Sequence, residues 1–160
     1  MRESVTYFFA GEKLGALLAV ILGIGTLAAS TLIWRTSYRW AVLPLGIIAL
    51  LHIGVGAFIY LRTDRQVARL CAQLDRNPAE FKAEEGLRMQ KIMRKFVVFK
   101  TVEVTLLALG LSLALFCKRR EELFAIGLGL IWQASVMLIF DLIMERRSQQ
   151  YLEAIERWTG

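Results

Sequence analysis

Four long apolar segments limit what this chain can fold into. They cover residues 14–34, 41–61, 96–117 and 123–144, and each is 21 or 22 residues long. An α-helix rises about 1.5 Å per residue, so about 20 apolar residues cross a hydrocarbon layer of about 30 Å. Hydrophobic residues make up 56% of the chain, which agrees with spans of this kind. We therefore predict an all-α, polytopic membrane protein with four transmembrane helices.

The short connections predict how these helices pair. Residues 35–40 separate the first two spans and residues 118–122 separate the last two, so each pair should form an antiparallel hairpin. The residues outside the spans are too few for a separate soluble domain of ordinary size. Residues 1–160 are therefore expected to form a single membrane domain.

The connection between the two hairpins, residues 62–95, has the pattern of two helices. Leu70 and Leu74 belong to an apolar stripe at helical spacing. Asn77 and Pro78 suit the N-cap and the first position of a following helix. We expect spans two and three to extend into a cytoplasmic helical stalk whose two apolar stripes bury each other. In the alternative, both amphipathic pieces lie flat on the membrane surface, attracted by anionic lipid.

The distribution of positive charge predicts the orientation. The side that holds both termini and residues 62–95 carries 14 Lys and Arg residues outside the spans, against 5 on the other side. The positive-inside rule then places both termini in the cytoplasm. Arg outnumbers Lys 14 to 6, which is typical of GC-rich bacterial genes and favours a bacterial inner membrane. Because basic residues beside spans contact anionic lipid headgroups, we expect the lipid bilayer and no nucleic acid as a partner.

Two further segments have helical patterns of their own. Residues 145–158 predict a short C-terminal amphipathic helix that lies at the interface or against the stalk. Small residues recur every four positions in the first span, at Gly11, Gly15, Ala19 and Gly23. Such a ladder allows helices to approach closely. It serves either packing within one chain or the face of a homodimer.

Five polar side chains lie inside the predicted spans: His52, Lys100, Glu103, Gln133 and Asp141. A charged group alone in hydrocarbon costs at least about 2.5–3.5 kcal/mol, so these residues should face inward and pair. Lys100 can pair with Glu103 on its own helix or with Asp141 from the fourth span. The cluster is either a cytoplasm-facing pocket, with Glu103 and His52 handling protons or cations, or a network that fixes helix packing.

Motifs of known enzyme classes are missing from the sequence. It contains no nucleophile elbow, zinc-protease motif, Walker A loop or dinucleotide fingerprint. With a single histidine, a haem held by two histidines of one chain is ruled out, and we expect no metal and no cofactor. The chain is therefore predicted not to be an enzyme.

Two functions remain from different classes. The first is a bacterial inner-membrane protein that binds another protein through the cytoplasmic stalk, as an accessory subunit, an assembly factor or an immunity-type protein. The alternative is a small oligomeric channel or a proton- or cation-coupled carrier that uses the intramembrane cluster. Homo-oligomerisation is compatible with both.

Overall fold

The computed structural model describes residues 1–159, and within them all regular structure is helical. The helices are α1 (Arg2–Ile33), a 3₁₀ turn η1 (Arg39–Ala41), α2 (Val42–Arg76), α3 (Pro78–Phe116) and α4 (Glu121–Arg157). Each of the four long helices contains a stretch that is long and apolar enough to cross a membrane. The prediction of an all-helical chain with four candidate spans is confirmed, and by length and composition this is a multi-pass membrane protein.

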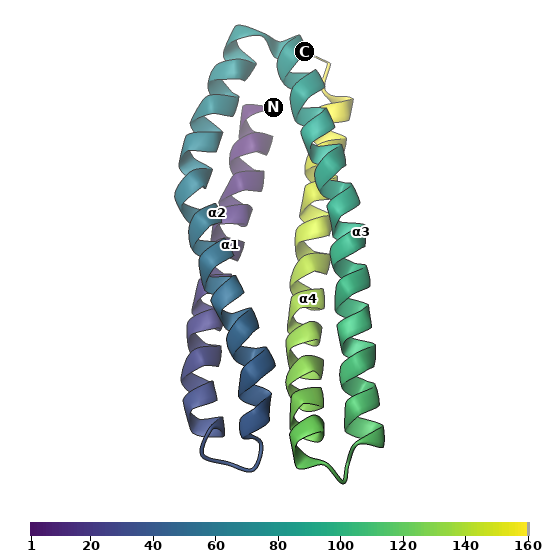
Figure 1. Cartoon of the computed structure of the whole chain (residues 1–160). Helices are drawn as coiled ribbons and strands as arrows, with labels where there is room; N and C mark the ends of the chain where they lie inside the picture. The colour runs from purple at the N-terminus through teal and green to yellow at the C-terminus, as the bar shows by residue number, and fades with distance from the viewer. Residues whose placement is uncertain (160) are drawn as a thin grey trace.

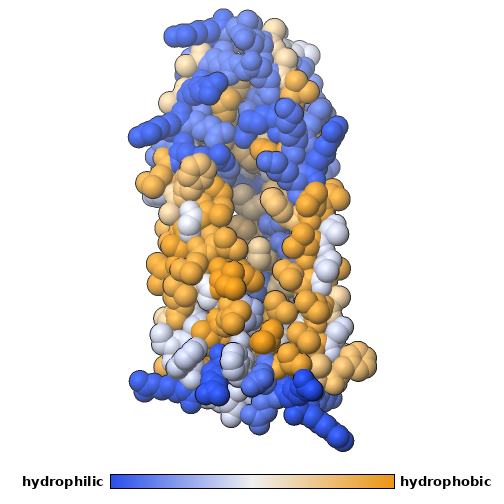
Figure 2. Space-filling model, in the orientation of Figure 1, coloured by the Kyte–Doolittle hydropathy of each residue, from blue (hydrophilic) through white to orange (hydrophobic). Residues whose placement is uncertain are grey.

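The four helices pack as two pairs (Figure 1). α1 lies along α2, and α3 lies along α4, while α4 also contacts η1, α2 and α1. Both chain ends and the α2–α3 turn lie at one end of the bundle, and the two short loops lie at the other. We call the first of these ends the polar end, because hydrophilic residues cover a long section of the bundle there (Figure 2).

An apolar band covers the bundle between its two hydrophilic ends (Figure 2). Large apolar side chains in this band are exposed on the outside of the helices, among them Leu50, Phe58, Val98 and Ile139. A contiguous exposed apolar surface of this kind marks contact with a membrane or another protein. The band therefore has the exterior that a lipid-embedded bundle requires.

The helices are longer than the predicted spans. α1 begins at Arg2, well before residue 14, and α4 continues to Arg157, so the helix predicted over residues 145–158 is the end of α4, up to Arg157, and not a separate helix. The break at Asn77 lies where the sequence places it. The Asn77 side chain accepts a hydrogen bond from the Glu80 backbone N–H at 3.3 Å, and Pro78 opens α3.

All four helices build the apolar core of the polar end. Its buried residues are Val5, Phe8 and Phe9 of α1, Leu70 and Leu74 of α2, Phe81 and Met89 of α3, and Tyr151 and Ile155 of α4. The rings of Phe8 and Tyr151 stack with centroids 4.4 Å apart. The two stripes of residues 62–95 therefore do not simply bury each other, because the start of α1 and the end of α4 contribute to the same core.

Burial recurs every seven residues along each helix, which is the spacing of a left-handed coiled coil. The buried series are Phe9, Ala16, Gly23 and Ser30 in α1; Ala49, Gly56, Thr63 and Leu70 in α2; Met89, Phe96, Glu103 and Gly110 in α3; and Gly127, Ala134, Ser148 and Ile155 in α4. Asp141, half-buried, takes the remaining position of the α4 series. Large side chains such as Phe9, Leu70 and Met89 belong to the series at the polar end, and Gly23, Gly56, Gly110 and Gly127 belong to it deeper in the apolar band.

The small residues let helix backbones touch. A Cβ atom added to Gly110 of α3 would lie 2.9 Å from the carbonyl oxygen of Gly127 in α4, and a Cβ atom added to Gly127 would lie 2.8 Å from that of Gly110. In the other pair, a Cβ atom added to Gly23 would lie 2.7 Å from the Ala49 carbonyl oxygen. Lipid gives helices no hydrophobic drive to associate, so close packing at such positions holds the pairs together.

We expect Gly110→Ala to destabilise the bundle by about 1–3 kcal/mol, because the added methyl group meets the backbone of α4. The matched control is Gly54→Ala, since nothing lies within 4 Å of a Cβ atom at Gly54. This control should change stability by no more than about 0.5 kcal/mol, apart from a gain in helix propensity. Reversible unfolding in detergent measures both, and equal stability of the two variants would contradict the close contact.

Candidate functional site

Glu103 is the most deeply buried charged residue of the apolar band. It occupies the seven-residue series of α3 between Phe96 and Gly110, and only 2% of its surface is exposed. No donor in the described chain forms a hydrogen bond with either of its carboxyl oxygens. The neighbouring ionisable group is the carboxyl group of Asp141, which takes the open position of the seven-residue series in α4. α3 and α4 thus bring two acidic side chains together inside the bundle.

Lys100 does not neutralise this pair directly. Its ammonium group donates to both carboxyl oxygens of Glu145, at 2.8 Å each. The sequence predicted Glu103 and Asp141 as partners of Lys100 and not Glu145, which lies one residue beyond the predicted span 123–144. The helical repeat could have found it, because Glu145 follows Asp141 by four residues and shares its face. A charged α3–α4 pair therefore lies one turn nearer the polar end than the two acids.

His52 and Gln133 form a separate contact between the two helix pairs. The Gln133 side-chain nitrogen lies 3.5 Å from His52 Nδ1, so it can donate to this atom when the imidazole proton is on Nε2. Gln133 is buried and His52 is half-buried. The five predicted residues are therefore divided: Lys100, Glu103 and Asp141 lie between α3 and α4, and the other two lie between α2 and α4.

The predicted small-residue ladder faces other helices of the same chain. A Cβ atom at Gly11 would overlap Arg147 of α4, one at Gly15 would lie 3.3 Å from the sulfur of Met144, and one at Gly23 would meet α2. Gly15 and Gly23 are buried, whereas Gly11 and Ala19 are only partly buried. The ladder thus contributes to packing inside the chain, and the deepest burial in α1 follows the seven-residue series instead.

A second buried acid, Glu85, lies in the core of the polar end. Arg88 donates to both of its carboxyl oxygens at 2.6 Å, and the Tyr151 hydroxyl donates to one of them at 3.2 Å. Burial and the neighbouring charge of Glu85 raise the pKa of Tyr151 well above its usual range. The sequence hinted at this site, because Glu85 interrupts an otherwise apolar stripe. Unlike Glu103, Glu85 has a full set of donors.

Glu12 of α1 is a third acid of the bundle interior, and it is only partly buried. It lies near the boundary between the polar end and the apolar band. Arg62 lies 3.6 Å from one of its carboxyl oxygens, and the other oxygen has no hydrogen-bond partner. Burial raises the pKa of Glu12, and the nearby charges of Arg62 and Arg88 oppose that rise. Glu12 therefore differs from Glu103 in having positively charged groups close to it.

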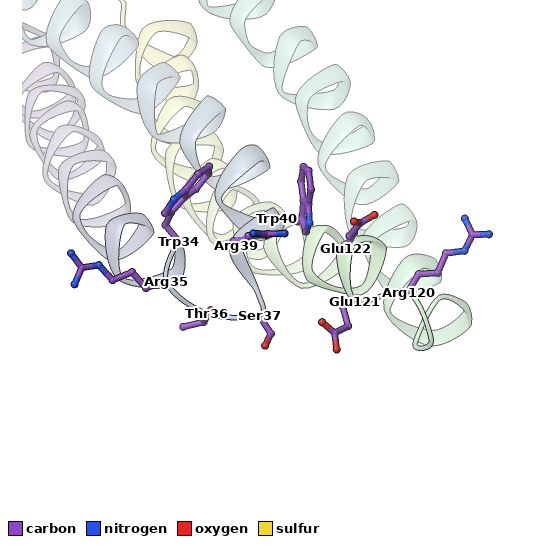
Figure 3. A pocket seen from close by; sticks show the side chains of 9 residues that line it. All are labelled: Trp34, Arg35, Thr36, Ser37, Arg39, Trp40, Arg120, Glu121 and Glu122. Atoms are coloured by element: carbon purple, nitrogen blue, oxygen red, sulfur yellow. The ribbon is translucent and has the colours of Figure 1, made fainter.

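A pocket of about 610 Å³ lies at the opposite end of the bundle (Figure 3). Its residues come from the two short loops and the start of α4: Trp34, Arg35, Thr36, Ser37, Arg39, Trp40, Arg120, Glu121 and Glu122. Both indole rings point back along the helices, and Arg35 and Arg120 point away from the bundle. Aromatic rings beside charged groups are typical of the membrane–water interface.

The chemistry that the interior acids Glu103 and Asp141 offer is the binding of a proton. Among residues 1–159, no group of three or more His, Cys, Asp or Glu side chains is arranged to hold a metal ion. Two carboxyl groups in contact can share one proton, since two negative charges at that distance repel each other.

No protein-family model, no curated protein and no solved structure matches this chain.

We expect Glu85→Ala to lower the stability of the folded chain by about 2–4 kcal/mol, because it leaves Arg88 and the Tyr151 hydroxyl without their acceptor. Glu84→Ala is the matched control, since Glu84 is exposed on the same helix. That change should cost less than about 0.5 kcal/mol. Thermal unfolding in detergent compares the two, and similar midpoints would show that the Glu85 network does not stabilise the polar end.

Proposed function

We propose that this chain is a non-enzymatic membrane protein that binds another protein at its polar end. The partner would dock outside the lipid, on the part of the bundle that extends beyond the apolar band. The proposed location is a bacterial inner membrane, with both termini and the α2–α3 turn in the cytoplasm. An accessory subunit, an assembly factor and an immunity-type protein all work in this way.

The observation that carries the proposal is a groove of about 400 Å³ between α1 and α4 at the polar end. It is lined by Glu3, Ser4, Tyr7, Phe8, Arg147, Gln150, Tyr151 and Ala154. Tyr7 is 71% exposed, and Arg147 lies over its ring, 5.2 Å from the centroid. Tyr and Arg are the residue types that most often dominate binding energy at protein interfaces. An exposed Tyr–Arg pair beside a groove is therefore a suitable anchor for a partner.

The rigidity of the polar end supports the same proposal. The aromatic and aliphatic core described above lies directly beneath the groove, since Phe8 and Tyr151 belong to both. An ion pair between Arg2 and Asp75, at 2.6 Å, joins the start of α1 to the end of α2. A surface held by a packed core loses little conformational freedom on binding, which favours affinity.

We expect Tyr7→Ala to reduce partner recovery at least about tenfold when the full chain is purified from native membranes, which corresponds to about 1.4 kcal/mol of binding energy. The variant should fold normally, because most of the Tyr7 side chain is exposed. The control is Trp132→Ala, which removes an aromatic ring 64% exposed in the apolar band. Partners that are recovered equally with both variants, or that are lost only with Trp132→Ala, would contradict docking at this groove.

The orientation is tested with single cysteines in a chain that carries Cys71→Ala and Cys117→Ser. Because the 14-to-5 bias of Lys and Arg favours a cytoplasmic polar end, Arg76→Cys should react with a membrane-impermeant thiol reagent only after the cells are opened. Ser37→Cys, in the loop at the opposite end, should react in intact cells. Both positions are exposed, so access to the thiol is not limited by packing. The reverse labelling pattern would place the groove outside the cytoplasm.

A further inference from the structure

We propose that Glu103 and Asp141 form a proton-binding site inside the apolar band, in which the two carboxyl groups share one exchangeable proton taken up from the polar end. This inference is independent of partner binding at the groove. It rests on the burial of Glu103, on the absence of any donor to its oxygens in residues 1–159, and on the second acid that faces it.

The charges around Glu103 are not balanced. Lys100, Glu103, Asp141 and Glu145 contribute one positive and three negative groups when all are ionised, a formal charge of −2. Lys100 holds both oxygens of Glu145 at 2.8 Å, so its charge is already paired. An ionised carboxylate without a partner in hydrocarbon costs several kcal/mol. Binding one proton removes a charge and supplies the donor that the Glu103–Asp141 pair lacks.

The number of oxygen ligands at the site suits a proton and not a metal ion. Hard metal cations in proteins need about six oxygen ligands, whereas a shared proton needs two. Glu103 and Asp141 provide the oxygens for a proton, and the other ionisable groups close to them are the paired Lys100 and Glu145. No group of three possible metal ligands occurs in residues 1–159. The composition of the site therefore fits a proton.

The surroundings of the pair give a proton access from the polar end. Glu103 is 2% exposed, and towards the polar end lie the half-buried Asp141 and then Glu145 and Lys100, whose side chains are 20% and 30% exposed. In the other direction the buried series continues with Gly110 in α3 and Ala134 in α4, which offer no side chain that can carry a proton. A proton would therefore enter and leave on the same side.

The titratable groups around the site come from few elements. α3 packs against α4, and it meets α2 across the turn that joins them. From α4, Asp141 and Glu145 face the site, and from α3 itself Lys100 does. The titratable group that α2 carries inside the apolar band is His52, whose imidazole contacts Gln133 on α4. Among these groups, Glu103 and Asp141 are the acids without a positively charged partner of their own.

The test is an infrared pH titration of the full chain in lipid nanodiscs, which follows the C=O stretching band of protonated carboxyl groups. At pH 6 exposed carboxyl groups are almost fully ionised. We expect about one protonated carboxyl group per chain at that pH, with the protonated-to-ionised ratio falling about tenfold per pH unit above the midpoint. Labelling all Glu residues with ¹³C at the side-chain carboxyl group should shift part or all of this band.

Variants assign the band to the pair. Glu103→Gln should abolish it, and Asp141→Asn should reduce it at least about threefold at pH 6, because the like charge is removed. Glu12→Gln is the matched control, because one carboxyl oxygen of Glu12 is also buried without a hydrogen-bond partner. The band should survive in that variant. If the Glu103 and Asp141 variants do not fold, the wild-type band and its survival in Glu12→Gln provide the test.

Three results would overturn the proposal. One is the absence of a protonated carboxyl band at pH 6 in the wild-type chain. Another is a band that disappears in Glu12→Gln and remains in Glu103→Gln. The third is a band that is lost when Na⁺ or K⁺ replaces choline at constant pH, because the pair would then bind a metal cation in place of the proton.

Discussion

Close contact between helix backbones at the glycines of the seven-residue series is the constraint on which this structure depends. Hydrocarbon offers no hydrophobic gain for bringing apolar helices together, so association relies on packing and on interhelical polar contacts. Gly23 and Gly56 provide that packing between α1 and α2, and Gly110 and Gly127 provide it between α3 and α4. At the polar end, where water restores the hydrophobic effect, the same series uses large residues such as Phe9, Leu70 and Met89.

The buried acids depart from this pattern in two different ways. Glu85 is surrounded by donors, with Arg88 at 2.6 Å and Tyr151 at 3.2 Å, so its carboxylate is compensated where it lies. Glu103 occupies the seven-residue series of α3, to which Glu85 does not belong, and lies deeper in the bundle, opposite another acid and without a donor. A packing role alone would be served better by a small residue, as at Gly110. Features that break a local rule without compensation are expected at functional sites.

The sequence predicted the helices well, and the contacts between them less well. Apolar length determines a span, and the Asn77-Pro78 pair marks a helix break, because both signals act locally. The pairing of Lys100 with Glu145 depends on the register of α3 against α4, which close contact at Gly110 and Gly127 sets. The four-residue ladder of α1 was visible in the sequence, but the seven-residue burial emerges only when two helices wind around each other.

The extension of α1 to Arg2 was missed for a related reason. Residues 2–13 mix charged, polar and aromatic side chains, so neither span length nor a simple stripe marks them as helix. Their apolar members, Val5, Phe8 and Phe9, become buried only because α2, α3 and α4 all extend beyond the apolar band to meet them. The polar end is therefore a product of tertiary packing, and reading residues 62–95 in isolation suggested two helices where four contribute.

The groove and the acidic pair share one helix, and this has a thermodynamic consequence. Tyr151, which lines the groove, follows Asp141 by about three helical turns, so these two residues lie about 15 Å apart along α4. Glu145 and Arg147 lie between them, in contact with Lys100 of α3 and Tyr7 of α1 respectively. If the position of α4 differs between the protonated and unprotonated states, partner affinity must depend on pH. Linkage requires that partner binding then change proton affinity by the same factor.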